Sequence, residues 1–392
     1  MEENRRSIEP DGKFVFPVIQ EQPDCGCGGK SAPANDSSAP GLDQSFVLGV
    51  IAAPAGPLPK VSSQLTREDH CGTIKARLGA GRMTYAIDPG LYALGKPDDQ
   101  SPVLVTANYK MSFDHLRQSL PDRNAWILVL DTRGINVWCA AGKGTFGTQE
   151  LIDKIETSGL KNVVSHRKII LPQLGAPGVA AHLVRQATGF KVHYGPVRAK
   201  DLPVFLDSGL KATKEMRTMA FPLKERAVLI PIELIATVKP FILISLALAF
   251  LAGLLGRSEF QSGIFNNGLF AVGALLSAVL AGTILLPLFL PYLPGRAFSV
   301  KGLFIGVVVA VGLIYLRGMD LQMWTGKMEA LSWLLIIPAV SAYLAMNFTG
   351  CSTYTSLSGV KKEMRLALPL EIVAGILGLV TWITSFIIAW EL

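Results

Sequence analysis

The sequence predicts an open, largely parallel α/β sheet domain of Rossmann or flavodoxin type, followed by an all-α membrane domain of five transmembrane helices. Two observations predict this division. Before residue 214, short apolar runs alternate with amphipathic segments, as in parallel sheets whose strands are joined by helices. After residue 227, the apolar residues gather into long runs, and the segment 262–295 contains no charged residue.

Four parts are therefore expected along the 392 residues: a disordered arm at 1–44, an α/β domain at 45–213, a linker or interfacial segment at 214–237 and a transmembrane domain at 238–392. Pro, Gly, Ser, Asn and scattered charges interrupt any periodic pattern in the arm. The arm contains Cys25 and Cys27, a Cys-x-Cys pair that can chelate a soft ion such as Hg(II) or Cu(I). The alternative is an incidental pair in an unstructured tail.

In the sheet domain, strands are expected at 83–87, 91–94, 102–106, 125–132, 168–172 and 191–194, with helices at 113–120, 148–157 and 178–188. Ligands of such sheets bind beyond the carboxyl ends of the strands. Thr106, the segment 136–143, and the loop that contains Gln173 and Gly175 all fall there. Each is an ordinary strand-to-helix turn when taken alone, but together they line one rim. Paired glycines in the last loop would let the backbone approach a ligand.

The segment 136–143, called here the cap segment, consists of Asn136, Val137, Trp138, Cys139, Ala140, Ala141, Gly142 and Lys143. Arg133 and Gly134 are expected to turn the chain, and Asn136 is a good N-cap for a short helix. Cys139 would then lie in the first turn, where the helix favours the thiolate that metals bind. The small residues after it would form a surface on which a flat ligand could lie. The alternative is a buried core thiol, since free cysteine is among the most buried residue types.

The cap segment resembles the signature of the HgcA family of mercury-methylating corrinoid proteins, written N-(V/I)-W-C-A-(A/G)-G-K, and matches it at all eight positions. The region from Phe46 to Val204 also resembles the corrinoid-binding domain of the corrinoid iron-sulfur protein large subunit. It departs from that protein in lacking a Cys-rich 4Fe-4S segment, since Cys71 stands alone. The Asp-x-His-x-x-Gly signature of many cobalamin enzymes is also absent, which favours Cys139 over a histidine as an axial ligand.

The resemblance implies a corrinoid (cobalamin-type, cobalt) cofactor with the Cys139 thiolate as its lower axial ligand. It further implies a methyltransferase that passes methyl from methyl-Co(III) to inorganic Hg(II), forming methylmercury. The expected partners are a ferredoxin-like protein with two 4Fe-4S clusters (HgcB), a methyl donor of folate or corrinoid-protein type, the Hg(II) substrate and the membrane. No nucleic-acid partner is expected.

Spans are expected at about 238–256, 268–290, 299–316, 329–348 and 369–390. Positive charge before the first span, and again at Lys361, Lys362 and Arg365, places the sheet domain in the cytoplasm. The expected location is the cytoplasmic membrane of an anaerobic prokaryote. Cys351 lies in a hydroxyl-rich stretch between spans four and five, either as a plain loop residue or as a thiol stop for a soft metal.

Two other functions stay open. A membrane-anchored corrinoid methyl carrier of acetyl-CoA-pathway type would use the same cofactor with a carbon-centred acceptor. A membrane transporter with a cytoplasmic sensor domain would use no corrinoid. Against this alternative, the expected spans contain almost no ionisable residues, which transport pathways usually need.

Overall fold

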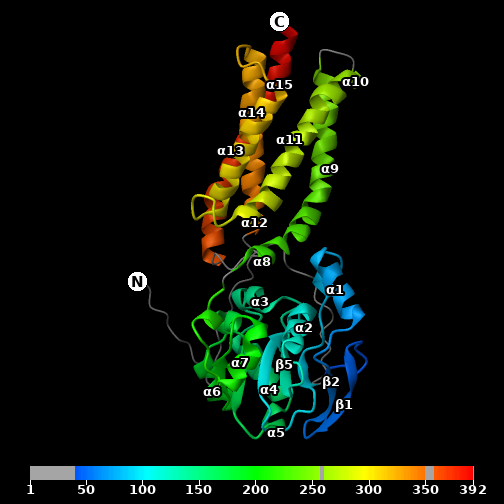
Figure 1. The fold of residues 1–392 in the computed structure, drawn as a ribbon, viewed down its shortest axis with the longest axis vertical. Helices are drawn as coiled ribbons and strands as arrows, with labels where there is room; N and C mark the ends of the chain where they lie inside the picture. Colours follow the sequence, from blue (N-terminus) through cyan, green and yellow to red (C-terminus); the bar gives the residue numbers. More distant parts are fainter. Residues whose placement is uncertain (1–39, 220, 257–259, 349–356, 392) are drawn as a thin grey trace, which may run out of the picture.

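The computed structural model of the chain describes residues 40–219, 221–256, 260–348 and 357–391. A sheet domain is followed by a bundle of long helices, and the chain passes from one to the other at the short helix α8 (Leu223–Ala227) (Figure 1). Cys25, Cys27, Cys351 and the greater part of the predicted arm lie outside the described residues. The C-terminal end of the last helix lies at the end of the bundle away from the sheet domain (Figure 1).

The sheet has seven described strands in the order β1-β2-β3-β5-β4-β6-β7. Their bounds are β1 (Val47–Ala53), β2 (Gly56–Val61), β3 (Gly90–Leu94), β4 (Val103–Ala107), β5 (Ala125–Leu130), β6 (Lys168–Leu171) and β7 (Lys191–Tyr194). Strands β5, β4, β6 and β7 pair in parallel, whereas β1 with β2 and β3 with β5 are antiparallel pairs. The sheet is therefore mixed, with a parallel half that carries the predicted rim.

Two predictions about the strands are wrong. The segment 83–87 forms no strand, because the chain turns through Gly81 at φ 65° into the 3₁₀ helix η1 (Arg82–Thr84) and only Ala86 makes an isolated bridge. Strands β1 and β2 were not predicted, since Pro57 and Pro59 argue against a strand in a sheet interior. Strand β3 pairs with β2 only beyond both prolines, at Lys60 and Val61, so no missing N–H interrupts that pairing.

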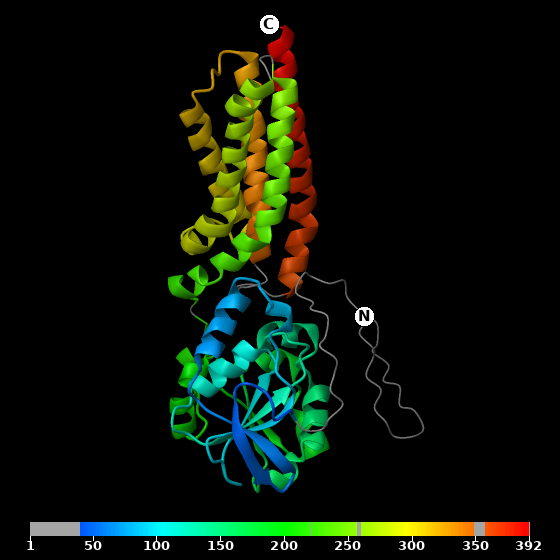
Figure 2. The ribbon, with the colours of Figure 1, turned by 90° about the vertical axis from the view of Figure 1, so that its right-hand side faces the viewer.

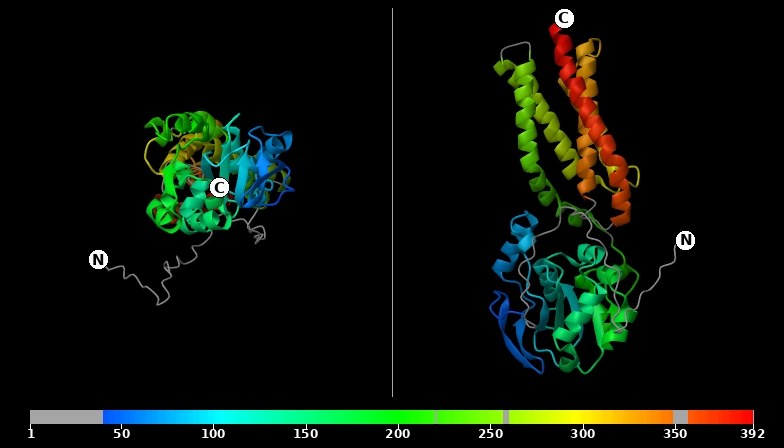
Figure 3. Two further views of the ribbon diagram at one scale, coloured as in Figure 1. Left: turned by 90° about the horizontal axis from the view of Figure 1, so that it is seen from below. Right: turned by 180° about the vertical axis from the view of Figure 1, so that it is seen from behind.

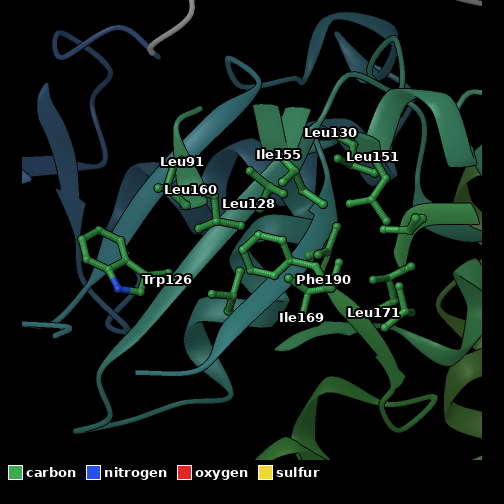
Figure 4. Packing of buried hydrophobic residues seen from close by; sticks show 14 of the residues in the cluster. Leu91, Trp126, Leu128, Leu130, Leu151, Ile155, Leu160, Ile169, Leu171 and Phe190 are labelled. Carbon is green, nitrogen blue, oxygen red and sulfur yellow. The ribbon is translucent and has the colours of Figure 1, made fainter. Parts of the chain in front are cut away.

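Helices cover both faces of the sheet. Their bounds are α1 (Arg67–Arg77), α2 (Lys110–Gln118), α3 (Val137–Lys143), α4 (Thr148–Thr157), α5 (Leu160–Val163), α6 (Ala181–Thr188) and α7 (Leu202–Asp207), with the 3₁₀ helices η2 (Gln173–Gly178), η3 (Ala199–Asp201) and η4 (Glu215–Arg217). Side chains alternate along β5, so Trp126 and Leu128 face the layer of α3, α4, α5 and α6, while Ile127 faces the layer of α2 and α7. Figure 4 shows the first of these two cores.

Among the described residues, five helices are long and apolar enough to cross a membrane: Leu223–Leu255, Phe260–Phe289, Phe298–Arg317, Trp324–Asn347 and Gly359–Ala389. The first consists of α8 and α9 (Ile230–Leu255). The second is built from five consecutive pieces: α10 (Phe260–Gly263), η5 (Ile264–Gly268), α11 (Leu269–Leu280), η6 (Ala281–Leu285) and α12 (Leu286–Phe289). The remaining three are α13 (Phe298–Arg317), α14 (Trp324–Asn347) and α15 (Leu357–Glu391). The number of candidate spans matches the sequence prediction.

Small residues let α13 approach α14 closely. A Cβ added at Gly302 would lie 2.5 Å from the Cβ of Ala345, and one at Gly306 would lie 2.5 Å from the Cα of Pro338. The Ser341 hydroxyl donates a hydrogen bond to the Gly302 carbonyl at 2.8 Å. Close backbone approach and interhelical hydrogen bonds of this kind replace the hydrophobic effect as the stabilising interactions between helices in lipid.

Candidate functional site

The parallel half of the sheet has a topological switch point between β4 and β6. If only these four strands are numbered along the chain, β4 is 1, β5 is 2, β6 is 3 and β7 is 4. Their order across the sheet is then 2-1-3-4, because β5 lies on one side of β4 while β6 and β7 lie on the other. Connections that leave neighbouring strands in opposite directions open a crevice at the carboxyl ends, where α/β sheets bind ligands. Helices α1 and α3 lie at the end of the sheet domain that faces the long helices (Figures 1 and 3). The crevice therefore faces the junction with the bundle.

The short helix α3 begins as the sequence predicts. Arg133 and Gly134 turn the chain with φ of 56° and 69°. Asn136 has extended backbone, and its side-chain oxygen accepts a hydrogen bond from the Cys139 amide at 2.9 Å. Gly144 ends the helix at φ 82°, in the left-handed conformation typical of helix ends. Cys139 is thus held in the first turn of a helix capped at both ends.

The two faces of α3 have different surroundings. Ala140 and Ala141 are buried in the sheet core, at 0% and 7% exposure. Val137, Trp138 and Cys139 are half-buried, whereas Gly142 and Lys143 are exposed. The expected open surface of Ala140, Ala141 and Gly142 is therefore wrong, because the two alanines face inward. Trp138, Cys139 and Gly142 remain accessible to a ligand.

The loop after β6 supports α3 from behind. A Cβ added at Gly178 would lie 2.1 Å from the Phe146 carbonyl oxygen and 3.2 Å from the Ala141 Cα, and one at Gly175 would lie 2.5 Å from the Phe146 ring. These glycines thus let η2 pack against α3 and its following loop. The sequence predicted that these glycines let a ligand approach the backbone. In the structure, Phe146 and Ala141 occupy the space beside them. Gln173 accepts a hydrogen bond from Arg217, which ties this loop to η4.

Asn108, which follows β4, organises the turn that leads to α3. Its side-chain oxygen accepts hydrogen bonds from the Thr132 amide at 3.1 Å, the Thr132 hydroxyl at 2.8 Å and the Gly134 amide at 2.9 Å. Its side-chain nitrogen donates to Asp131 Oδ1 at 3.2 Å. The side chain thus connects the loops after β4 and β5 across the sheet edge. Thr106, the residue of this strand that was predicted to line the rim, is 3% exposed and lies within the sheet.

Glu150 on α4 supports the same turn. Its carboxylate accepts a hydrogen bond from the Asp131 amide at 2.8 Å. Burial raises the pKa of Glu150, and the hydrogen bond from Asp131 opposes that shift. The sequence did contain a signal for Asn108, because a polar residue directly after a buried strand is a candidate for the rim of the sheet. Nothing local in the sequence indicated that Glu150 would reach back to this loop.

A buried ionic cluster fixes α1 to α2 beside the switch point. Lys110 lies 2.6 Å from Asp69 and 2.7 Å from Asp114, and Arg117 lies 2.7 Å from Asp69 and 2.8 Å from Asp114. Burial alone would raise the pKa of Asp69, but hydrogen bonds from Lys110, the Thr66 amide and Arg117 hold it well below its usual range. All four charged groups are at least 93% buried. No local sequence pattern predicts this cluster, because Asp69 and Arg117 are 48 positions apart.

No group of three or more His, Cys, Asp and Glu side chains that could hold a metal ion occurs among the described residues. His166 lies at the opposite, amino edge of the sheet, where it borders a cavity of about 480 Å³ with Arg123 and Lys168. The described histidines thus belong to no such group.

The fold and the crevice define an α/β domain with a flavodoxin-type order in its parallel half and a capped thiol helix at the switch point. Residues 80–206 match the family described as CO dehydrogenase/acetyl-CoA synthase delta subunit. This match contains β3 to β7, α3 and the loops of the crevice.

Curated relatives match the same part of the chain. The acetyl-CoA decarbonylase/synthase complex subunit gamma of Methanopyrus kandleri is 34% identical over 128 residues, which are 32% of this chain and 27% of the relative. The subunits of the same name from Methanothermobacter thermautotrophicus and Methanocaldococcus jannaschii are 33% and 38% identical, over 32% and 24% of this chain and 28% and 20% of the relatives. The chain therefore spans about a quarter of the length of these relatives.

Proposed function

We propose that this chain is a membrane-anchored corrinoid protein that takes part in methyl transfer. The observation that carries the proposal is the position of Cys139, in the first turn of a doubly capped helix at the switch point of a sheet related to acetyl-CoA decarbonylase/synthase subunits. The residues at this crevice fit a corrinoid. A soft sulfur donor is half-buried on the accessible side of α3, next to an indole and to Gly142, which has no side chain.

A bound corrinoid would supply a cobalt ion that takes up a methyl group and passes it on. Cys139 would hold the cobalt through its sulfur, and Asn136 would keep the cysteine in place through the 2.9 Å hydrogen bond of the N-cap. Trp138 and Gly142 would contact the ring, with Lys143 at its edge. Val137, Ala140 and Ala141 would set the distance from the sheet, while Thr106, Gln173 and Gly175 would position the loops behind α3.

The comparisons favour a carbon-centred methyl acceptor, because the relatives named above are subunits of acetyl-CoA decarbonylase/synthase complexes. A methyl carrier of this type, tethered to the membrane by the candidate spans, is the first proposal. In that case the carrier would meet its methyl donor and its acceptor protein at the crevice.

Hg(II) is a second candidate acceptor, and a specific observation supports it. Hg(II) requires a methyl group with carbanion character, and an electron-rich thiolate ligand on the cobalt would favour it. Cys139 would be that ligand, and its cap segment matches the mercury-methylation signature at all eight positions. The five cysteines of the sequence include no set that could bind an iron-sulfur cluster, so the electrons would come from a separate ferredoxin-like partner.

The test uses the full chain, purified without oxygen and loaded with cobalamin. Methyl transfer is measured to Hg(II) and, in parallel, to the acetyl-CoA-forming acceptor. Cys139→Ala and Cys139→Ser should both lower transfer by more than about 100-fold, because changes that only touch a metal ligand's surroundings already cost 10- to 100-fold. Both variants should also change the visible spectrum, because the ligand field depends on the sulfur.

Cys71→Ser is the matched control, since Cys71 is an exposed cysteine on α1. It should keep both the spectrum and the rate. A Cys139→Ser protein with an unchanged spectrum and full transfer to both acceptors would refute the ligand assignment. If the natural sequence transfers methyl to only one of the two acceptors, Hg(II) or the acetyl-CoA-forming acceptor, that result decides between the two candidate functions.

A further inference from the structure

Arg226 on α8 is a buried cation for which the structure provides no partner among the described residues. The residue is 5% exposed, and its Nε and Nη1 atoms are buried without a hydrogen bond. An unpaired charge in low-dielectric surroundings is costly, and buried charges in proteins are normally paired and hydrogen-bonded. A guanidinium cannot escape this cost by losing its proton.

No ion pair joins Arg226 to an Asp or Glu of the described residues. The adjacent acid, Glu225, pairs with Arg198 at 2.9 Å and so fastens α8 to the loop after β7. Helix α8 packs against α12, in a region where Phe221 and Leu229 form an apolar cluster with Leu286. A bound anion would supply the counter-charge that the described residues do not provide.

The location of Arg226 limits what that molecule is. Helix α8 lies at the junction of the two parts of the chain (Figure 2), and α12 ends a candidate membrane span there. The junction is at the level of lipid headgroups if the span crosses a bilayer, and it faces the crevice that contains α3. Both settings supply the same chemistry, because a phospholipid headgroup and the nucleotide tail of a complete corrinoid each contain a phosphodiester monoanion.

We propose that Arg226 is the centre of a phosphodiester-binding site at this junction. The planar fork of a guanidinium matches two phosphate oxygens, and such charge-assisted pairs are stronger than neutral hydrogen bonds. Binding would neutralise the buried charge and hold α8 against the end of the bundle. The corrinoid source of the phosphodiester rests on the proposed function, whereas the lipid source does not.

The test compares three probes on the full chain in phosphate-free maltoside detergent: a short-chain phosphatidylglycerol, cyanocobalamin, and dicyanocobinamide, which lacks the nucleotide tail and its phosphodiester. Affinity is measured by equilibrium binding and by the rise in melting temperature. Arg226→Gln should weaken binding of one phosphodiester probe by about 10- to 100-fold, the range expected for a charge-assisted pair. Dicyanocobinamide binding should stay unchanged.

Lys224→Gln is the matched control, because it removes a positive charge from the exposed side of the same helix. Without ligand, Arg226→Gln should melt no lower than the natural protein, since it removes an unpaired buried charge. A selective loss of cyanocobalamin affinity identifies the corrinoid tail, and a selective loss of phosphatidylglycerol affinity identifies a lipid site. Equal effects of Arg226→Gln and Lys224→Gln on all probes would overturn the proposal. If the unsubstituted protein binds neither cyanocobalamin nor dicyanocobinamide, the proposal that the chain is a corrinoid protein is overturned. The effect of Arg226→Gln on phosphatidylglycerol binding then decides whether Arg226 binds a phosphodiester.

Discussion

Replacing Asn108 by alanine should release the turn that positions α3 while leaving the sheet folded. The change removes four hydrogen bonds and leaves the amide of Thr132, which is 0% exposed, without its partner. At about 1 kcal/mol for each net hydrogen bond, and less for the longest of the four at 3.2 Å, the local loss is about 3–4 kcal/mol. Since 1.4 kcal/mol is a factor of ten, the opening of the turn should become about 100- to 1000-fold more frequent.

Hydrogen exchange followed by mass spectrometry measures this opening directly. The amides of Thr132 and Gly134 should exchange faster by that factor in Asn108→Ala, and corrinoid affinity should fall with them. Asn124→Ala is the control, because its side-chain oxygen accepts one hydrogen bond from the exposed Lys96 amide at 2.9 Å at the other edge of the sheet. Unchanged exchange at Thr132 and Gly134 in Asn108→Ala would refute the assigned role of this side chain.

Three further predictions concern other parts of the chain. Gly178→Ala should displace α3 and lower the melting temperature, at a cost of about 1–3 kcal/mol, because the new Cβ would lie within 3.3 Å of three backbone atoms. Gly49→Ala should not, because a Cβ there meets nothing within 4 Å. Asp69→Asn should destabilise the domain by about 3–5 kcal/mol, because it leaves buried cations short of a counter-charge, and thermal melts read this out. Since the folded pKa of Asp69 lies below its unfolded value near 4, its stabilisation is present above about pH 4 and lost on further acidification, a slope that Asp69→Asn should lack. Replacing Cys25 and Cys27 by alanine should slow methylation only at limiting Hg(II), and complete loss at saturating Hg(II) would contradict an accessory role.

The sequence by itself determined the elements whose signals are local. Strand β5 is a continuous apolar run, and β4 is one except for Thr106, because both faces of each strand are buried; this pattern identifies them without any knowledge of their neighbours. The cap of α3 was also predictable, because an N-cap depends on a side chain and an amide three residues apart. Long uncharged runs likewise predicted five candidate spans, since span length follows from bilayer thickness.

Only the tertiary structure decided which of these local features come together. The order of the strands, and with it the switch point, depends on pairings between segments far apart in the chain. Ala140 faces the core rather than a ligand because η2 and the sheet cover it, and Gly175 is small because Phe146 occupies the space beside it. The ionic cluster of Asp69 with Lys110 and the unpartnered charge of Arg226 have no local signature. Burial and long-range pairing set the energy of a charge, and neither quantity is a property of the residue's neighbours in sequence.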